Sequence, residues 1–115
     1  MTQVQRGEVW WANLPVPFGS EPGYRRPVLI IQAESFNRSG IRTALAAVVS
    51  GNLTLAAAPG NVLIPSDVSG LPKDSVLNVS QILTLDRTRL AERVSRLPRH
   101  WMAAIDDGLR LAMEL

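Results

Sequence analysis

The sequence PVLIIQA at positions 27–33 is a near-continuous apolar run that begins with a proline. A run of this length is typical of a β-strand that is buried on both faces. Positions 6–14 (RGEVWWANL) are rich in Trp and Val and favour an earlier strand. Positions 15–23 (PVPFGSEPG) repeat Pro, Gly and Ser, so they predict a loop between the two strands.

Short strands and turns are expected along the middle of the chain. Apolar or alternating segments predict strands at 43–50 (TALAAVVS), 61–64 (NVLI) and 75–80 (SVLNVS), the last continued after a bend by 81–85 (QILTL). Small and turn-forming residues predict a turn at 36–40, an ordered loop at 51–60 and a turn-rich link at 65–72.

The C-terminal segment differs, because its apolar residues recur at helical spacing. Pro98 suits the first position of a helix, and Asp106 and Asp107 fall on its solvated side. One apolar stripe follows Pro98, formed by Trp101, Met102, Ile105, Leu109, Ala112 and Met113. Short strands followed by one helix predict a single α+β, mostly β domain over residues 1–115. We expect a small, twisted, partly open β-barrel with this amphipathic helix packed against it.

Composition limits the chemistry that the chain can perform. The 115 residues suffice for one domain, and 46% apolar with 19% charged residues is a globular composition. The chain has no cysteine, and His100 is its one histidine, expected in solvent. Disulfides, thiolate metal sites and mechanisms built on two histidines are therefore excluded, and we expect no metal and no cofactor.

The N-terminal residues 1–6 are polar, and no apolar run is long enough to span a bilayer. We therefore expect no signal peptide, no membrane contact and a cytoplasmic location.

The positive charge is carried almost entirely by arginine. Lys73 is the single lysine, and the net charge is +2. Arginine presents a planar fork of donors that suits phosphate and carboxylate. A GC-rich genome would also favour arginine codons, so only an arginine in a special local setting is informative.

Arg26 has such a setting. It follows the loop and directly precedes Pro27, which biases Arg26 toward extended backbone angles. We expect it at the entry of the buried strand, with its guanidinium projecting into the concavity beneath the loop. The alternative is that Arg26 forms an ion pair with Glu21 or another nearby acid.

Taken together, several segments resemble the MazF/PemK family of toxin–antitoxin ribonucleases, which includes Kid. They are RGEVWWANL, GSEPGYRRPVLIIQ, FNRS, LPKDSVLNVSQILTLD and the amphipathic C-terminal helix, in the order and at the spacing of the family. The resemblance implies the barrel fold shared by MazF, Kid and the gyrase poison CcdB. It also implies cleavage of single-stranded RNA, mainly messenger RNA, at short motifs, with 2′,3′-cyclic phosphate and 5′-hydroxyl ends. A homodimer is implied, inhibited by an antitoxin whose acidic C-terminal segment covers the RNA groove.

The resemblance assigns Arg26 and Ser50 as the catalytic residues. Where the Kid branch has an arginine and an aspartate in the later strand and a histidine in the first loop, this sequence has Asn78, Ser80 and Ser20. This departure favours Arg26 with Ser50. The expected substrate contacts are Ser20, Glu21, Tyr24, Arg25, Asn78, Ser80 and Gln81, with Tyr24 a candidate for stacking on a base.

The chemistry of RNA cleavage suits these residue types. RNA carries its own nucleophile, the 2′-hydroxyl, so the protein must position and stabilise a crowded dianionic phosphorane. A guanidinium and a serine hydroxyl can donate to its oxygens. Glu21 is the nearest carboxylate along the chain and is either the general base or an ion-pair partner that orients Arg26. The leaving oxygen takes its proton from Arg26 or from water.

Other residues have two interpretations. Trp10 and Trp11 point to opposite faces of one strand, so one is expected in the core and the other against a partner or a base. The basic run near the C-terminus is either a solvated face or an extension of the RNA track; it comprises Arg87, Arg89, Arg93, Arg96 and Arg99.

Two other functions compete with the nuclease. One is a gyrase poison of the CcdB kind, which depends on an apolar Trp-Gly-Ile tail, whereas this chain ends in Met-Glu-Leu at 113–115. The other is a non-catalytic nucleic-acid-binding module on the same fold.

Overall fold

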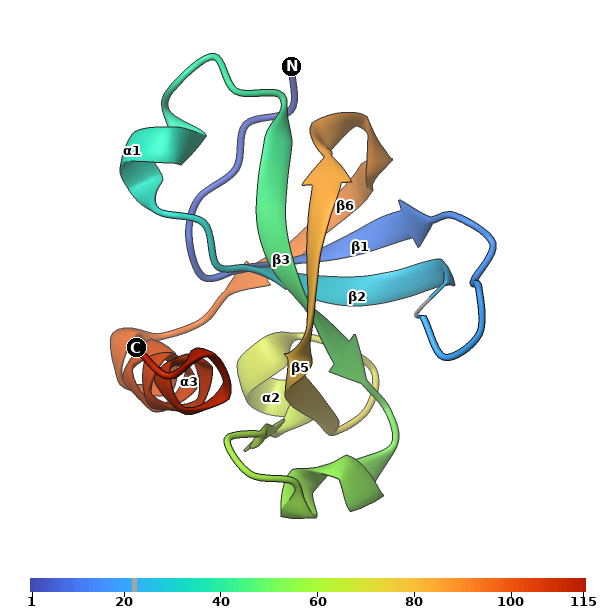
Figure 1. Cartoon of the computed structure of the whole chain (residues 1–115), viewed down its shortest axis with the longest axis vertical. Coiled ribbons are helices and arrows are strands. Elements are labelled where there is room, and N and C mark those ends of the chain that lie inside the picture. Colours follow the sequence, from blue (N-terminus) through green and yellow to red (C-terminus); the bar gives the residue numbers. More distant parts are fainter. Residues whose placement is uncertain (22) are drawn as a thin grey trace.

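Six strands form one antiparallel sheet that curls into a partly open barrel (Figure 1). This computed structural model describes residues 1–21 and 23–115, so Pro22, in the predicted loop, lies outside the described residues. The spatial order is β4-β5-β3-β2-β1-β6. The strands are β1 (Glu8–Leu14), β2 (Tyr24–Ile30), β3 (Thr43–Ser50), β4 (Val62–Ile64), β5 (Ser75–Asp86) and β6 (Leu90–Arg96). The predicted mostly-β barrel is confirmed.

The helical elements are short except for the last. They are α1 (Glu34–Asn37), η1 (Leu53–Ala57), α2 (Ser66–Ser69), η2 (Arg87–Arg89) and α3 (Arg99–Met113). The predicted turn at 36–40 therefore begins as a helical turn, and the predicted loop at 51–60 and link at 65–72 each contain one. Single turns of this kind are made by hydrogen bonds within four or five residues and carry no apolar periodicity, so the sequence pattern does not reveal them.

Two apolar clusters lie on opposite faces of the curled sheet, and β2 contributes to both. Leu29 belongs to the cluster that α3 covers, which also contains Val49, Leu77 and Ile105. Val28 and Ile30 belong to the second cluster, which contains Val4, Trp10, Ala12, Ala46 and Leu85. The prediction of a strand buried on both faces is confirmed, although β2 begins at Tyr24, so that it includes Arg26, and ends at Ile30 rather than at position 33.

The strand β6 was not predicted. Four of its seven residues are polar or charged, and it forms one edge of the sheet with β1 as its partner. Charged side chains are typical of edge strands, where they oppose pairing with other chains, and they remove the apolar alternation by which strands are recognised.

The prediction that Arg87 is a solvated residue is wrong. Its side chain is 1% exposed, and its guanidinium donates to the carbonyls of Thr2 and Asn37 at 3.2 and 2.9 Å. Arg87 thus ties the N-terminal segment and α1 to the end of β5. Its partners lie 85 and 50 residues away along the chain, so no local pattern indicates them.

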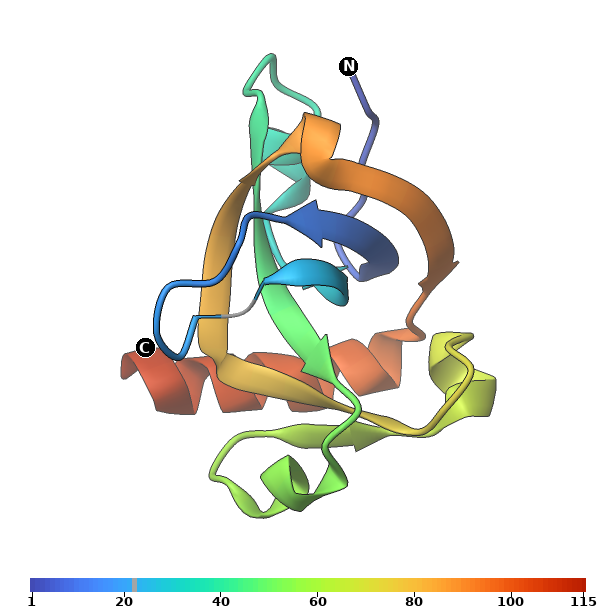
Figure 2. The same cartoon turned by 90° about the vertical axis from the view of Figure 1, so that its right-hand side faces the viewer.

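The helix α3 lies across one end of the curled sheet, next to the first half of β5 (Figure 2). Pro98 precedes the helix as its N-cap rather than opening it. Met102, Ile105 and Leu109 are buried as predicted, but Ala112 and Met113 are exposed because the last turn extends past β5 (Figure 2). Asp106 accepts a hydrogen bond from Arg6 at 2.6 Å, whereas Asp107 is exposed.

Close backbone packing between Gly108 of α3 and Gly60 leads to a stability prediction. A Cβ atom at position 108 would lie 2.1 Å from the Gly60 carbonyl oxygen. Gly108→Ala should therefore push α3 off the sheet and cost about 2 kcal/mol, despite the better helix propensity of alanine. Calorimetry should show a melting temperature lower by roughly 10 °C. Gly40→Ala is the matched control, because its Cβ meets nothing within 4 Å; equal stability of the two variants would contradict this packing argument.

Candidate active site

The sheet splits where β2 and β3 separate. Their ladder contains three residue pairs and ends at Val28 and Val48. Beyond this point β2 stays paired with β1 as far as Tyr24, and β3 stays paired with β5 as far as Ser50 (Figure 1). Pro27, which has no backbone N–H to offer, is the first residue of β2 past the ladder. The two ends of the split are thus Arg26 on β2 and Ser50 on β3.

The two predicted catalytic residues share one face of the sheet. Residues of a strand alternate between faces, so Arg26 lies on the face of Val28 and Ile30. Ser50 lies on the face of Ala46, which belongs to the same cluster. Continuing the β2–β3 register by two residues would place Arg26 opposite Ser50. Both side chains therefore border the split from the same side.

Asn78 joins this face from β5. It pairs with Val48, and directly paired residues project to the same side of a sheet. Its side-chain oxygen accepts hydrogen bonds from the backbone N–H and the hydroxyl of Ser80, at 3.2 and 2.7 Å. The β3–β5 register shifts between Ile82 and Asn78, which confirms the predicted bend in β5 and places Ser80 and half-buried Gln81 within it.

The guanidinium of Arg26 is exposed, and within the described residues 1–21 and 23–115 it forms no ion pair. Its Nε donates to the carbonyl oxygen of Gly23 at 3.4 Å. Gly23 is buried against the loop, where an added Cβ would lie 2.3 Å from Pro17 Cδ. Close packing of the loop thus fixes the carbonyl that holds Arg26.

Glu21 contacts the loop instead of Arg26. Its Oε1 accepts from the backbone N–H of Phe18 at 3.2 Å, while its own N–H donates to the Phe18 carbonyl at 3.1 Å. The alternative in which Glu21 neutralises or orients Arg26 through an ion pair is therefore wrong for this structure. Glu21 lines a small pocket between the loop and the second half of β5, together with Leu83 and Arg89.

Ser50 is 9% exposed and is oriented by its neighbour. Its Oγ accepts a hydrogen bond from the backbone N–H of Asn52 at 3.1 Å. Because that contact uses a lone pair, the hydroxyl hydrogen can still be donated to a ligand. A guanidinium fork and a hydroxyl donor on one face can together bind the oxygens of a phosphoryl group.

The remaining predicted residues lie on or beside the loop. Ser20 is exposed. Tyr24 is 64% exposed and has a φ of 62°, an unfavourable conformation for a bulky side chain. Arg25 points to the other face of β2, where its guanidinium stacks 5.0 Å from the centre of the Trp11 ring and binds Glu92 at 3.3 Å. Trp10 is buried in the second cluster, whereas Trp11 is half-buried and packs against the cluster that α3 covers.

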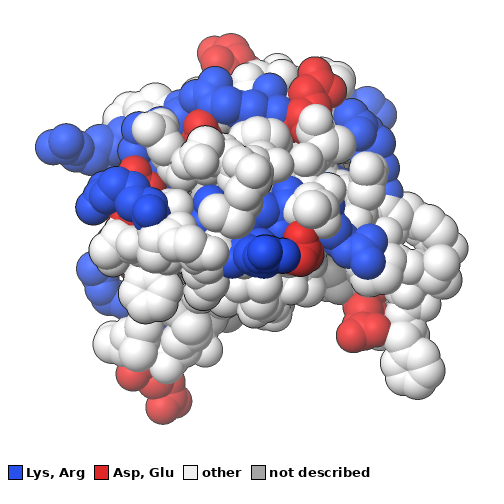
Figure 3. Space-filling view, turned by 90° about the horizontal axis from the view of Figure 1, so that it is seen from above, with Lys and Arg blue, Asp and Glu red and all other residues white. Residues whose placement is uncertain are grey.

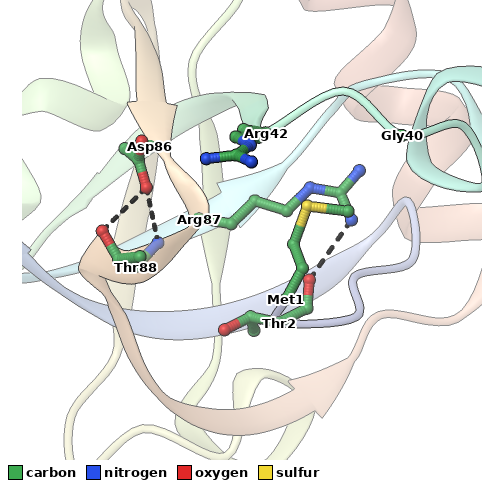
Figure 4. Close-up of a pocket in the computed structure, with 7 residues that line it drawn as sticks. All are labelled: Met1, Thr2, Gly40, Arg42, Asp86, Arg87 and Thr88. Atoms are coloured by element: carbon green, nitrogen blue, oxygen red, sulfur yellow. Dashed lines mark hydrogen bonds between the residues drawn. The ribbon is translucent and has the colours of Figure 1, made fainter.

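A larger pocket, of about 490 Å³, lies away from all these residues (Figure 4). It is lined by Met1, Thr2, Gly40, Arg42, Asp86, Arg87 and Thr88. Hydrogen bonds from the backbone N–H and the hydroxyl of Thr88 lower the pKa of Asp86, and the charges of Arg42 and Arg89 lower it further. Burial acts in the opposite direction, but its effect is smaller than that of the hydrogen bonds. Asp86 accepts hydrogen bonds from the backbone N–H and the hydroxyl of Thr88, and Arg87 donates to the carbonyl of Thr2 (Figure 4). These contacts stabilise the turn between β5 and β6 and the N-terminal segment beside it.

The basic run near the C-terminus does not form one continuous track. Arg93 and Arg96 bind Glu8 and Glu34, and Arg87 is buried. On the face seen in Figure 3, basic side chains are spread out and interleaved with acidic ones.

Within the described part of the chain, no three His, Cys, Asp or Glu side chains are grouped so that they could hold a metal ion. Nor does any described helix have the length and apolar character needed to cross a membrane.

Comparison with known proteins identifies relatives over nearly the whole chain. A family model described as PemK-like, MazF-like toxin of type II toxin-antitoxin system matches residues 5–113. Endoribonuclease MazF6 of Mycobacterium tuberculosis is 46% identical over 112 residues, which are 97% of this chain and 98% of that protein. Endoribonuclease EndoA of Bacillus subtilis is 36% identical over 112 residues, 97% of this chain and 96% of that protein.

A solved structure shares the fold. It is that of an endoribonuclease in complex with its cognate antitoxin from mycobacterial species, with a TM-score of 0.75 and 23% identity. The match covers 100% of this chain and 97% of that chain.

Proposed function

Because the chain belongs to the PemK-like, MazF-like toxin family of type II toxin–antitoxin systems, we propose that it is an endoribonuclease whose active site is the split between β2 and β3. The substrate is single-stranded RNA, cut at a short sequence motif. The observation that supports this site is that the ladder ends two residues before Arg26 and Ser50, on one shared face. This arrangement places a guanidinium fork and a hydroxyl donor on the two sides of the split.

The proposed reaction is transesterification within the RNA. The 2′-oxygen attacks the adjacent phosphorus, the bond to the 5′-oxygen breaks, and the products carry a 2′,3′-cyclic phosphate and a 5′-hydroxyl. Arg26 binds two phosphoryl oxygens through parallel N–H donors, and Ser50 donates a third hydrogen bond. Both interactions strengthen as negative charge accumulates in the transition state.

Glu21 is proposed as the general base. Its carboxylate accepts a hydrogen bond from the backbone N–H of Phe18 instead of pairing with Arg26, which supports this role over that of an orienting partner. The leaving 5′-oxygen takes its proton either from Arg26, which is protonated at neutral pH, or from a water molecule.

Incubating the purified protein with a long mixed-sequence RNA in excess EDTA tests the proposed function. The composition lacks the residues of a thiolate or poly-histidine metal site, so we expect cleavage at a defined motif in the chelator. Cleavage that needs added Mg²⁺ would contradict the metal-independent mechanism. Intact RNA together with inhibition of gyrase would favour a poison of the CcdB kind, and RNA binding without cleavage would favour a non-catalytic module.

Ser50→Ala should lower kcat/KM on the order of 10- to 100-fold, because it removes one neutral donor to the phosphorane. The loss should be smaller than that for Arg26. The exposed Ser39→Ala is the control, since Ser39 follows α1 at the other end of β3. Equal rates for Ser50→Ala and the wild-type protein would remove Ser50 from the mechanism.

We propose a homodimer as the active form. A 12.6 kDa domain has a small concavity, whereas sequence-selective cleavage requires several nucleotides to be held at once. A two-fold dimer lengthens the groove without new sequence. Light scattering at micromolar concentration should give about twice 12.6 kDa. A stable monomer that cuts at a defined motif would contradict this model.

The antitoxin partner follows from the family. Its acidic C-terminal segment is proposed to occupy the same groove and to exclude RNA by competition, with Arg26 of both protomers among its contacts. Arg25 lies on the other face of β2, where it pairs with Glu92, so the structure does not place it in this groove. Part of this affinity is charge pairing, so it weakens as salt rises. The proposed location of toxin and antitoxin is the cytoplasm.

A further inference from the structure

A small apolar pocket lies directly in the split of the sheet, on the face opposite to the Arg26 side chain. Its volume is about 250 Å³, and it is lined by Trp11, Pro27, Gly51, Leu71, Pro72, Lys73 and Ser75. Trp11 and Pro27 come from β1 and β2, while the other residues follow β3 or precede and begin β5. The pocket therefore exists because β2 and β3 separate at this point.

The pocket adjoins the proposed catalytic residues through the backbone. Pro27 directly follows Arg26, and Gly51 directly follows Ser50. The pocket and the proposed catalytic side chains therefore border the split between β2 and β3 from its two opposite faces. The segment Leu71–Lys73 forms the outer wall.

The walls suit a flat, aromatic ligand. They present an indole ring and two proline rings, and no lining residue is acidic. The Trp11 ring is held in place by Arg25, which stacks on it and is itself bound by Glu92. Lys73 supplies a positive charge at the pocket, and Arg25, paired with Glu92, lies beside it. Apolar ring faces bordered by cations are the combination that binds a base together with its flanking phosphates.

We propose that this pocket binds one nucleobase of the RNA, that of a nucleotide next to the scissile phosphate, and so contributes to the choice of cleavage site. The proposal rests on the proposed function. The volume lies below the ~300–1,000 Å³ of sites for drug-sized ligands, which fits one ring system and not a longer peptide segment. Trp11, Leu71 and Lys73 then act in substrate selection, which extends the site beyond the predicted contact residues.

Filling the pocket tests the proposal. A Cβ at Gly51 meets nothing within 4 Å, and Gly51 has no positive φ, so Gly51→Leu places a side chain at the pocket without a clash in the backbone. Gly40→Leu is the matched control, since Gly40 is equally open and lies before β3, at its other end. We expect both variants to have the melting temperature of the wild-type protein and Gly40→Leu to cleave RNA at the wild-type rate. Gly51→Leu should lose at least tenfold in kcat/KM or cut at altered motifs.

An abasic substrate makes the test specific for base binding. In an RNA oligonucleotide that carries the wild-type cleavage site, one base flanking the cut is removed in turn on each side. The wild-type protein should cut one of these two substrates at least tenfold more slowly than the intact oligonucleotide. The Gly51→Leu variant should cut that same substrate at nearly the rate at which it cuts the intact one. Such non-additivity is expected when both changes abolish one contact. Lys73→Ala, at an exposed position, should reduce kcat/KM several-fold and lessen its salt dependence.

The outcomes separate this inference from the proposed function. No cleavage by the wild-type protein would defeat the proposed function itself. Cleavage by Gly51→Leu at the wild-type rate and motif would overturn the base pocket and leave the nuclease intact. Normal cleavage by Gly51→Leu combined with escape from the antitoxin would also overturn it, because the pocket would then belong to the protein partner.

Discussion

Replacing Arg26 with lysine is expected to lower kcat/KM for RNA cleavage by roughly 100-fold or more, about 3 kcal/mol of transition-state stabilisation, although the positive charge is kept. Lysine presents a single ammonium and cannot form two parallel hydrogen bonds to the phosphorane. It also lacks the Nε–H that donates to the Gly23 carbonyl, so its position in the split would no longer be fixed. Single-turnover cleavage of an RNA oligonucleotide measures the effect on the chemical step.

Two controls show whether the loss is specific to Arg26. Arg25→Lys makes the same change one residue earlier, on the other face of β2, where the guanidinium contacts Trp11 and Glu92. It should cost only several-fold, because these contacts concern binding. Arg110→Lys, at an exposed position of α3 paired with Asp107, should be neutral. Circular dichroism should show all three variants folded. A lysine variant at position 26 within a few-fold of wild type would remove Arg26 from the centre of the mechanism.

The apolar run at 27–33 predicted the existence of a buried strand correctly, because burial on both faces leaves a continuous signal in the sequence, but the strand ends at Ile30. Val28, Leu29 and Ile30 are fully buried between the two clusters. The start of the same strand was not predicted, since Tyr24 and Arg25 are exposed and are held in it by pairing with β1. Pairing partners distant along the chain also explain why the polar edge strand β6 and the burial of Arg87 were missed.

The candidate site was predictable only in part, for a similar reason. Arg26 and Ser50 were selected by resemblance, and their residue types suit phosphate chemistry. Their common face depends on the β2–β3 register, which is a property of the folded sheet. The base pocket depends on the divergence of these strands, which brings Trp11 and Lys73 together across 62 positions of sequence. The residues next to Trp11 and Lys73 along the chain give no indication that the two line one pocket.

Replacing the ribose on the 5′ side of the cut by deoxyribose should abolish cleavage at that bond while binding persists. The proposed nucleophile is the 2′-oxygen of that ribose, which the deoxyribose substrate lacks. The effect should exceed that of Arg26→Lys, because the substitution removes a reacting atom and not a stabilising contact. Binding should change little, since the phosphate and base contacts proposed for Arg26, Ser50 and the Trp11 pocket do not involve the 2′-hydroxyl. Gel electrophoresis of the end-labelled oligonucleotide measures cleavage, and fluorescence anisotropy measures binding. The same oligonucleotide with deoxyribose one position further from the cut serves as the control and should be cleaved. Cleavage of the first substrate would mean that water is the nucleophile, and the transesterification mechanism would have to be abandoned.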